Sequence, residues 1–249
     1  MKIAFPLLTV LGLAPIAWCG QVNGHDNYRE IREIRTSFTG SMDVDASPVG
    51  AITVRAWDQP EVLIRAEIEA DSAAIAAQVV ITESAGVVRA TGPVEGYGTR
   101  HWTVGYEIFL PPAADLALKA NVGAISVHGV AGKLRCGTSV GALLLASLAG
   151  DAQCTTSVGA ILIALAGDHW DGAGLNVRTD VGAIDLTLPP DYSAHLDLST
   201  TLGTIVTNLP LPVLKVGMLG RTVSADLGAG GASVTAATKV GAVTVKAGL

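Results

Sequence analysis

The chain has 249 residues, of which 49% are hydrophobic, 15% are charged and only 4% are aromatic, and 29 residues are glycine. Its net charge of −6 argues against nucleic acid and anionic membrane surfaces as partners, because both select basic surfaces. Small and β-branched residues in these proportions are typical of stacked β-strands.

Residues 1–20 have the pattern of a secretory signal peptide. Lys2 supplies a positive start, an apolar run covers residues 3–17, and polar residues begin at Gln21. This order predicts cleavage near Cys19 or Gly20, and therefore export to the periplasm, the outer surface or the medium. A lipid anchor at Cys19 is the weaker interpretation, because Trp18 stands where a lipobox has a small residue. The mature chain has no apolar run long enough to predict a transmembrane helix.

Residues 21–112 predict a β-rich N-terminal part with one short helix. The helix is expected at residues 71–78, where Asp71 and Ser72 precede an alanine-rich run and either can serve as the N-cap. Residues 79–90 are expected to form a hairpin. The charged segment 28–35 fits either a short helix or an edge strand, and a solvated lead-in is the simpler interpretation. Other short strands are expected at residues 42–46, 52–55, 62–68 and 104–110.

Residues 113–249 carry a repeat built on glycine. Val or Leu, then Gly, then Ala or Thr, then an aliphatic residue recur six times, at Gly123, Gly141, Gly159, Gly182, Gly203 and Gly241, and a seventh copy stands at Gly50. Successive glycines from Gly123 to Gly203 are 18, 18, 23 and 21 residues apart. A period near 20 residues predicts a solenoid, in which each coil is covered by the next. We therefore expect an all-β fold: a single-stranded parallel β-helix or β-solenoid, continuous with an N-terminal β-rich capping part.

The glycines themselves are interpreted as structural corners, where each coil turns. We expect replacement of Gly159 by Val to lower stability rather than to remove a specific activity. Counting from each glycine, the residues seven, five, three and one before it, and two after it, alternate with polar residues. These positions are predicted to point inward. The segment 211–230 interrupts the period.

The chain resembles the bacterial exported "putative adhesin" β-solenoid family, a domain-of-unknown-function group. The resemblance covers about residues 38–247 and rests on three features: the Val49–Ile52 motif, the segment 106–112 (Tyr-Glu-Ile-Phe-Leu-Pro-Pro), and the repeats from Gly123 to Val243. Relatives commonly have Ser or Asn before the glycine and Asp after it, whereas this chain has Val and Ala. The resemblance implies a fold and no catalytic residues.

Two pairs of residues fall at equal positions in adjacent repeats. Cys136 and Cys154 are one repeat apart, so stacking would bring their Cα atoms within reach of a disulfide; the simpler interpretation is two small buried residues. Leu144 and Leu162 break the alternation and are predicted to point outward as a stacked apolar patch for a partner. The simpler interpretation is that another part of the chain covers them.

The sequence offers no spacing typical of a metal site, and no cofactor is predicted. His169, Trp170 and Asp171 occupy the longest turn between repeats and are a modest candidate for binding, with a plain loop as the simpler interpretation. Asp180, Asp185 and Asp197 are outward carboxylates of a kind that could serve acid–base chemistry in a polysaccharide hydrolase. Solvated surface charges explain them more simply.

The first functional hypothesis is a non-enzymatic exported β-solenoid, a structural or adhesin-like interaction module at the cell envelope. Its partner would be a protein or another envelope component, and an oligomer remains open. The alternative is a carbohydrate-active hydrolase or lyase on a β-helix scaffold. A third option is a lipid-anchored or oligomeric component of an envelope sensor, which acylation of Cys19 would support.

Overall fold

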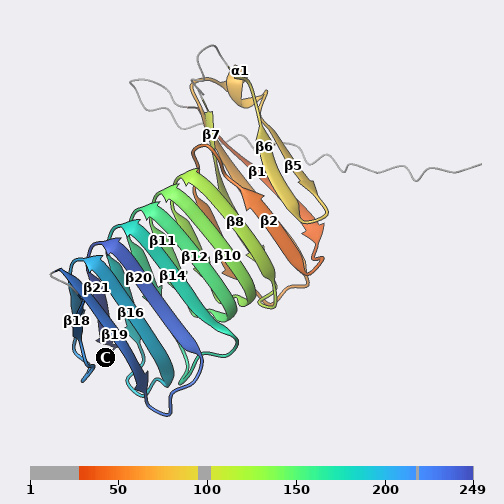
Figure 1. Cartoon of the computed structure of the whole chain (residues 1–249). Helices are drawn as coiled ribbons and strands as arrows, with labels where there is room; N and C mark the ends of the chain where they lie inside the picture. The colour runs from red at the N-terminus through yellow and green to blue at the C-terminus, as the bar shows by residue number, and fades with distance from the viewer. Residues whose placement is uncertain (1–27, 95–101, 217–218, 249) are drawn as a thin grey trace, which may run out of the picture.

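The computed structural model describes residues 28–94, 102–216 and 219–248, so the predicted signal peptide and Cys19 lie outside the described residues. Two sheets of ten and eleven strands face each other along an elongated stack (Figure 1). Successive coils of the repeat region pair in parallel. The predicted all-β solenoid is therefore confirmed. Within these ranges, no helix is both long enough and apolar enough to cross a membrane.

The N-terminal part starts both sheets. Its strands are β1 (Tyr28–Ser37), β2 (Ser41–Asp45), β3 (Ile52–Ala56), β4 (Glu61–Ala70), β5 (Val80–Ser84), β6 (Val87–Thr91) and β7 (Trp102–Leu110). The segment left open between helix and strand is the edge strand β1, antiparallel to β4. The expected hairpin is β5–β6. The expected helix is α1 (Ala73–Ala76), where the Ser72 hydroxyl accepts a hydrogen bond from the Ile75 N–H as its N-cap.

Each coil of the repeat contributes one long strand to the eleven-stranded sheet and one short strand to the ten-stranded sheet. The pairs are β8 (Asp115–Val122) with β9 (Ile125–His128), β10 (Ala131–Val140) with β11 (Leu143–Ala146), β12 (Ala149–Val158) with β13 (Ile161–Ala164), β14 (Gly174–Val181) with β15 (Ile184–Leu188), β16 (Ala194–Leu202) with β17 (Ile205–Thr207), and β20 (Ser233–Val240) with β21 (Val243–Ala247). The corner glycine separates the two strands of a pair.

The coils do not stack in chain order throughout. The last coil, β20–β21, lies between β14–β15 and β16–β17, and β20 pairs in parallel with both β14 and β16. The segment that interrupts the period, residues 211–230, brings the chain to this position. It contains β18 (Leu214–Val216) and β19 (Gly220–Leu227), and β19 runs antiparallel along the outer side of β16. The chain then turns past the start of β16 and returns on its inner side. The C-terminal coil therefore fills a gap between two earlier coils.

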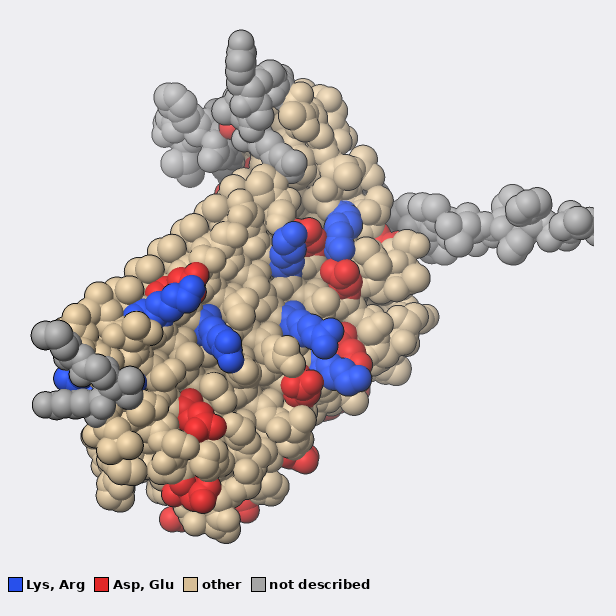
Figure 2. All heavy atoms as spheres, in the orientation of Figure 1, with Lys and Arg blue, Asp and Glu red and all other residues tan. Residues whose placement is uncertain are grey.

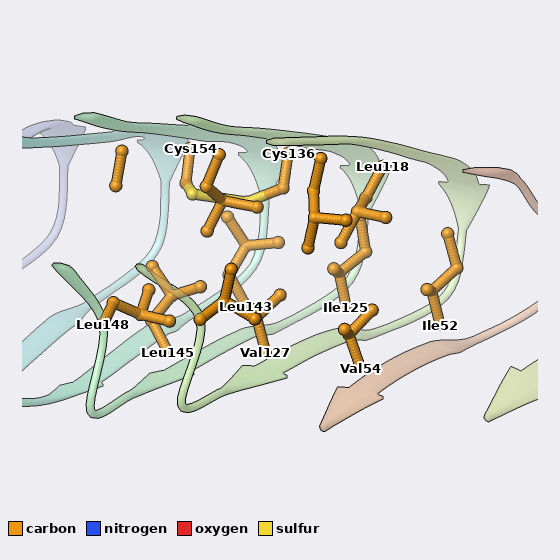
Figure 3. Close-up of a cluster of buried hydrophobic side chains, with 14 of the residues drawn as sticks. Ile52, Val54, Leu118, Ile125, Val127, Cys136, Leu143, Leu145, Leu148 and Cys154 are labelled. Atoms are coloured by element: carbon orange, nitrogen blue, oxygen red, sulfur yellow. A yellow bond between two sulfur atoms is a disulfide. The ribbon is translucent and has the colours of Figure 1, made fainter. Parts of the chain in front are cut away.

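The core lies between the two sheets. Side chains from facing strands, such as Leu118 and Cys136 on one sheet and Ile125 and Leu143 on the other, point into this space (Figure 3). Most of its members are Ala, Val, Leu and Ile, and all but a few are less than 5% exposed. Each coil contributes only a few such residues and cannot bury its own apolar face. The neighbouring coils cover that face instead.

The corner glycines form one continuous column. A Cβ on Gly159 would lie 1.9 Å from the carbonyl oxygen of Gly141, and Gly159 has a φ of +156°. Both the space and the backbone conformation therefore exclude a side chain. The same close approach repeats at every contact in the column, which runs Gly50, Gly123, Gly141, Gly159, Gly182, Gly241, Gly203.

A second column, of threonines, secures the glycine column. Five threonines of the repeat are buried: Thr138, Thr156, Thr179, Thr238 and Thr200. Each donates a hydrogen bond from its Oγ1 to the glycine carbonyl of the adjacent coil, at 2.9 to 3.1 Å. The buried hydroxyls are thereby satisfied, as the cost of burying a polar group requires.

One part of the predicted inward register is wrong. The residues seven, five and three before the glycine, and two after it, point inward as expected, but the residue directly before it does not. In the second coil Thr138 is buried while Val140 is 47% exposed. The ladder pairs Thr138 with Thr156 and Val140 with Val158, and both Ser139 and Val140 are exposed, so the alternation breaks at the corner.

Candidate functional site

The two predicted leucines lie together on the outer face of the ten-stranded sheet. Leu144 of β11 and Leu162 of β13 are in register and are 41% and 43% exposed. Their neighbours in the same row are Ser126 on one side and Asp185 on the other. The simpler interpretation, that another part of the chain covers them, is therefore wrong for the part of the chain that the structure describes.

A longer apolar surface, which sequence reasoning placed in the core, runs along the corner. The residues before the seven glycines pair into one row, here called the corner ladder: Val49, Val122, Val140, Val158, Val181, Val240 and Leu202. Each is 41 to 48% exposed. One signal in the sequence could have revealed this ladder. The buried threonine precedes the glycine by three residues, and the two residues between them both point outward.

Cys136 and Cys154 are joined by a disulfide between β10 and β12, with 4.6 Å between their Cα atoms. Figure 3 shows the bond inside the core, across from Leu143. The bond ties two adjacent coils that already pair in register. This position makes it a structural crosslink, and an oxidising compartment is where such a bond forms and persists.

A polar cluster that the sequence did not reveal lies on the outer face of the eleven-stranded sheet. His195 of β16 contacts the Asp226 carboxylate of β19 through Nδ1 at 2.6 Å, and its Nε2 lies 3.3 Å from the Ser224 hydroxyl. Asp197 is 3.5 Å from the same Nε2 and accepts a hydrogen bond from Ser224 at 2.8 Å. The hydrogen bond with Asp226, followed by the charge of Asp197, raises the pKa of His195.

This cluster has the connectivity of a nucleophilic triad but not its setting. Asp226, His195 and Ser224 follow the order of acid, base and hydroxyl. However, Ser224 is on a strand paired with β16, rather than on a sharp turn or a helix N-terminus where N–H groups would stabilise an oxyanion. The raised pKa also favours the protonated imidazole, a form that cannot act as a base. The cluster is better explained as a clasp between β16 and β19.

The other predicted polar residues are not brought together. Asp185 is on the ten-stranded sheet and Asp180 and Asp197 on the other, and β20 separates β14 from β16, so the three carboxylates do not share neighbouring coils. Asp180 pairs with Lys239 at 2.8 Å. The described residues contain no group of three His, Cys, Asp or Glu placed to hold a metal ion.

The turn that contains His169, Trp170 and Asp171 is largely structural. Trp170 is buried and donates from its indole N–H to the Gly150 carbonyl at 3.0 Å. His169 contacts Asp168 at 2.6 Å, which holds the pKa of that carboxyl below its usual value. The aromatic ring therefore supports the core and does not present a binding surface.

The depressions on the described surface include two shallow ones. One, of about 340 Å³, lies near the C-terminal end of the stack and is lined by Leu188, Pro189, Tyr192 and Leu209 among others. Burial raises the pKa of Tyr192 to about 12, so its hydroxyl stays neutral at physiological pH. The other, of about 250 Å³, is lined by Arg65, Glu67, Gly105 and Glu107 among others. Neither gathers the catalytic candidates named above.

Comparison with known proteins gives structural matches alone. No family model and no curated protein matches the chain. A putative cell adhesion protein from Clostridium sporogenes is 12% identical, with 90% of this chain and 100% of that chain covered and a TM-score of 0.45. A putative adhesin from Bacteroides fragilis is 12% identical, with coverage of 90% and 98% and a TM-score of 0.43. A putative adhesin from Parabacteroides distasonis is 11% identical, with coverage of 90% and 98% and a TM-score of 0.32.

The chain is similar in structure to bacterial putative adhesins. This similarity concerns the fold and extends over about nine-tenths of the chain.

Proposed function

We propose that this protein is an exported, non-enzymatic β-solenoid that serves as a structural or adhesin-like interaction module at the cell envelope. The observation that carries the proposal is the stacked pair Leu144 and Leu162, exposed in register on a sheet face. Outward positions of a sheet are ordinarily polar, and exposed apolar groups on a rigid surface mark places where a partner binds. The partner is a protein or another component of the envelope.

The scaffold suits such a role because binding would require little reorganisation. The ladders between coils and the Thr–Gly hydrogen bonds fix the spacing of the outward side chains. A preorganised surface loses less conformational entropy on binding. The disulfide between Cys136 and Cys154 joins β10 and β12, the long strands of the same two coils, and supports stability outside the cytoplasm.

The experiment measures binding of the purified, labelled protein to envelope fragments of the producing bacterium. The variant Leu144→Glu with Leu162→Glu is compared with Thr53→Glu with Thr244→Glu, which adds the same two charges at outward positions of the same sheet. We expect the leucine variant to lose binding at least tenfold and the threonine variant to retain it. Equal binding by all three proteins would refute the role of the leucines, and fractionation that finds the protein in the cytoplasm would refute export.

The carbohydrate-active alternative has one observation in its favour, the cluster of Ser224, His195, Asp197 and Asp226. Release of reducing ends from envelope polysaccharides tests it. Activity that disappears in Asp226→Asn and in Ser224→Ala would establish the enzyme, and activity that is absent or unchanged in both variants would dismiss this cluster as its site.

A further inference from the structure

The corner ladder is an apolar ridge that the fold itself does not require. Its seven side chains point away from the core, whose inward positions at the corner are filled by the buried threonines and by aliphatic residues after the glycine. At other outward positions of the same long strands the chain has residues such as Lys119, Arg135 and Gln153. The β-propensity of Val alone would not select it at six of seven corner positions when Thr serves as well.

The ridge is continuous and has a fixed repeat. Consecutive members are paired strand neighbours, so they are about 4.8 Å apart and the row is roughly 29 Å long. Alanine follows the glycine in six of the seven coils, which leaves the Val side chains standing above a floor of small residues. In Figure 1 this edge is where the arrows of β8, β10 and β12 end. Figure 2, in the same orientation, shows this edge as a band largely free of charged side chains.

The flanks of the ridge carry no net charge. The residues preceding the ladder members include Asn121, Ser139 and Ser157, and the two charged ones, Asp180 and Lys239, neutralise each other at 2.8 Å. The whole chain has a charge of −6, so two copies repel each other over most surfaces. The ridge and its flanks add no net charge to that repulsion, which favours a second copy of the same chain as the occupant.

The exposed area is also of the size that self-association needs. With roughly 60 Å² of apolar surface on each ladder residue, the ladder and its alanine floor present on the order of 500 Å². Two copies would bury about 1,000 Å², which is near the lower limit for a specific complex. A second ladder has the same repeat, so the two rows can stay in contact over their full length.

We propose that two copies of this chain associate through their corner ladders about a twofold axis. With the axis perpendicular to the ridge, the ladders run in opposite directions and each residue faces its counterpart counted from the other end. Val158 is the fourth of the seven members and lies at the axis, while Val49 of one copy faces Leu202 of the other. The proposal goes beyond the proposed function, since an interaction module can act as a monomer and Leu144 and Leu162 lie outside the ladder.

Sedimentation equilibrium of the exported, purified protein tests the proposal over about 1 to 200 μM. We expect a reversible monomer–dimer equilibrium with a Kd on the order of micromolar, as the area suggests. Val140→Lys with Val158→Lys should weaken the dimer at least tenfold. The control Thr53→Lys with Thr244→Lys adds the same charges on a sheet face and should dimerise as the parent does. Circular dichroism and the melting temperature verify that each variant folds.

A single cysteine provides a second measurement that does not depend on destabilising the contact. Val158→Cys should crosslink into covalent dimers under mild oxidation, whereas Thr187→Cys, outward on the other sheet, should not. A parent that stays monomeric throughout the range overturns the proposal, as does a folded Val140→Lys, Val158→Lys protein that dimerises normally. A monomeric parent that binds neutral lipid vesicles through these valines would overturn it as well, because the occupant would then be a membrane. The dimerisation result does not depend on whether the Leu144→Glu, Leu162→Glu variant binds envelope fragments, so the two proposals can fail separately.

Discussion

Thr238 donates a hydrogen bond from its Oγ1 to the carbonyl oxygen of Gly182, 3.0 Å away although the two residues are 56 positions apart in the chain. The other buried threonines reach glycines 15, 15, 20 and 41 positions away. The same local contact is therefore made between coils that are consecutive in the sequence and between coils that are not. The corner geometry, rather than chain order, determines which coils can stack.

The glycine column predicts a large penalty for any side chain at its centre. In Gly159→Ala the new Cβ would meet the Gly141 oxygen at 1.9 Å, and neither backbone can move without breaking the ladder. We expect unfolding free energy to fall by at least about 4 kcal/mol, or the protein to fail to fold. Gly105→Ala is the matched control, because its Cβ would meet nothing nearer than 3.8 Å. Chemical denaturation that finds the two variants equally stable would contradict the packing described for the corner.

The threonine column predicts a smaller and specific cost. Thr156→Val keeps the shape of the side chain but removes its hydrogen bond to Gly141, and we expect a loss of about 1 to 2 kcal/mol. Thr155→Val, on the outward side of the same strand, should change stability by less than about 0.5 kcal/mol. The comparison is made by urea unfolding. A Thr156→Val protein as stable as the Thr155→Val protein would show that the buried hydroxyl does not contribute.

The disulfide predicts a mass change and a stability change. Protein recovered after export should gain the mass of two hydrogen atoms on reduction of the Cys136–Cys154 bond. Replacing both cysteines by alanine should cost about 3 kcal/mol, the value expected from constraining a loop of this length; the cysteines are 18 residues apart. Intact-mass spectrometry that finds no change with reductant would rule out the bond in the mature protein.

The His195 clasp predicts a pH dependence of stability. The folded pKa of His195 is raised above its usual 6.5, so the folded state binds the proton more tightly than the unfolded chain does. The stabilisation is complete below about pH 6.5 and is lost as pH rises through the raised folded pKa. The groups facing the imidazole are Asp226 on β19 and Asp197 on β16, while Ser224 is neutral.

Melting temperatures of the parent and of His195→Gln measure this dependence. We expect the parent to exceed the variant most at about pH 5.5 and the two to converge near pH 9. Asp226→Asn should remove most of the difference, because it takes away the main partner of the imidazole. A gap that is constant with pH would mean that His195 contributes packing alone.

The repeat and its periodicity were sufficient to predict the solenoid, because the spacing of Gly123, Gly141 and Gly159 translates directly into coil length. They also placed Cys136 beside Cys154 and Leu144 beside Leu162. These predictions succeed where adjacent coils are also consecutive in the chain, so that one offset in the sequence equals one step in the stack.

The remainder depends on contacts that sequence offsets do not encode. The insertion of β20–β21 between earlier coils follows from the return path of β19, and the meeting of His195 with Asp226 follows from the same path. Strict alternation predicts an inward Val140, but alternation does not continue across the corner. Ser139 and Val140 both point outward, and the positive φ of Gly141 then turns the chain.

The central claim is that binding takes place at Leu144 and Leu162, on the outer face of the ten-stranded sheet, and not at the polar cluster around His195 on the other sheet. Hydroxyl-radical footprinting of side chains, on the protein bound to envelope fragments and free in solution, tests it most directly. We predict that oxidation of Leu144 and Leu162 falls on binding while oxidation around His195 is unchanged. Unchanged leucines together with protection around His195 and Asp226 would contradict the account and favour an active site at that cluster.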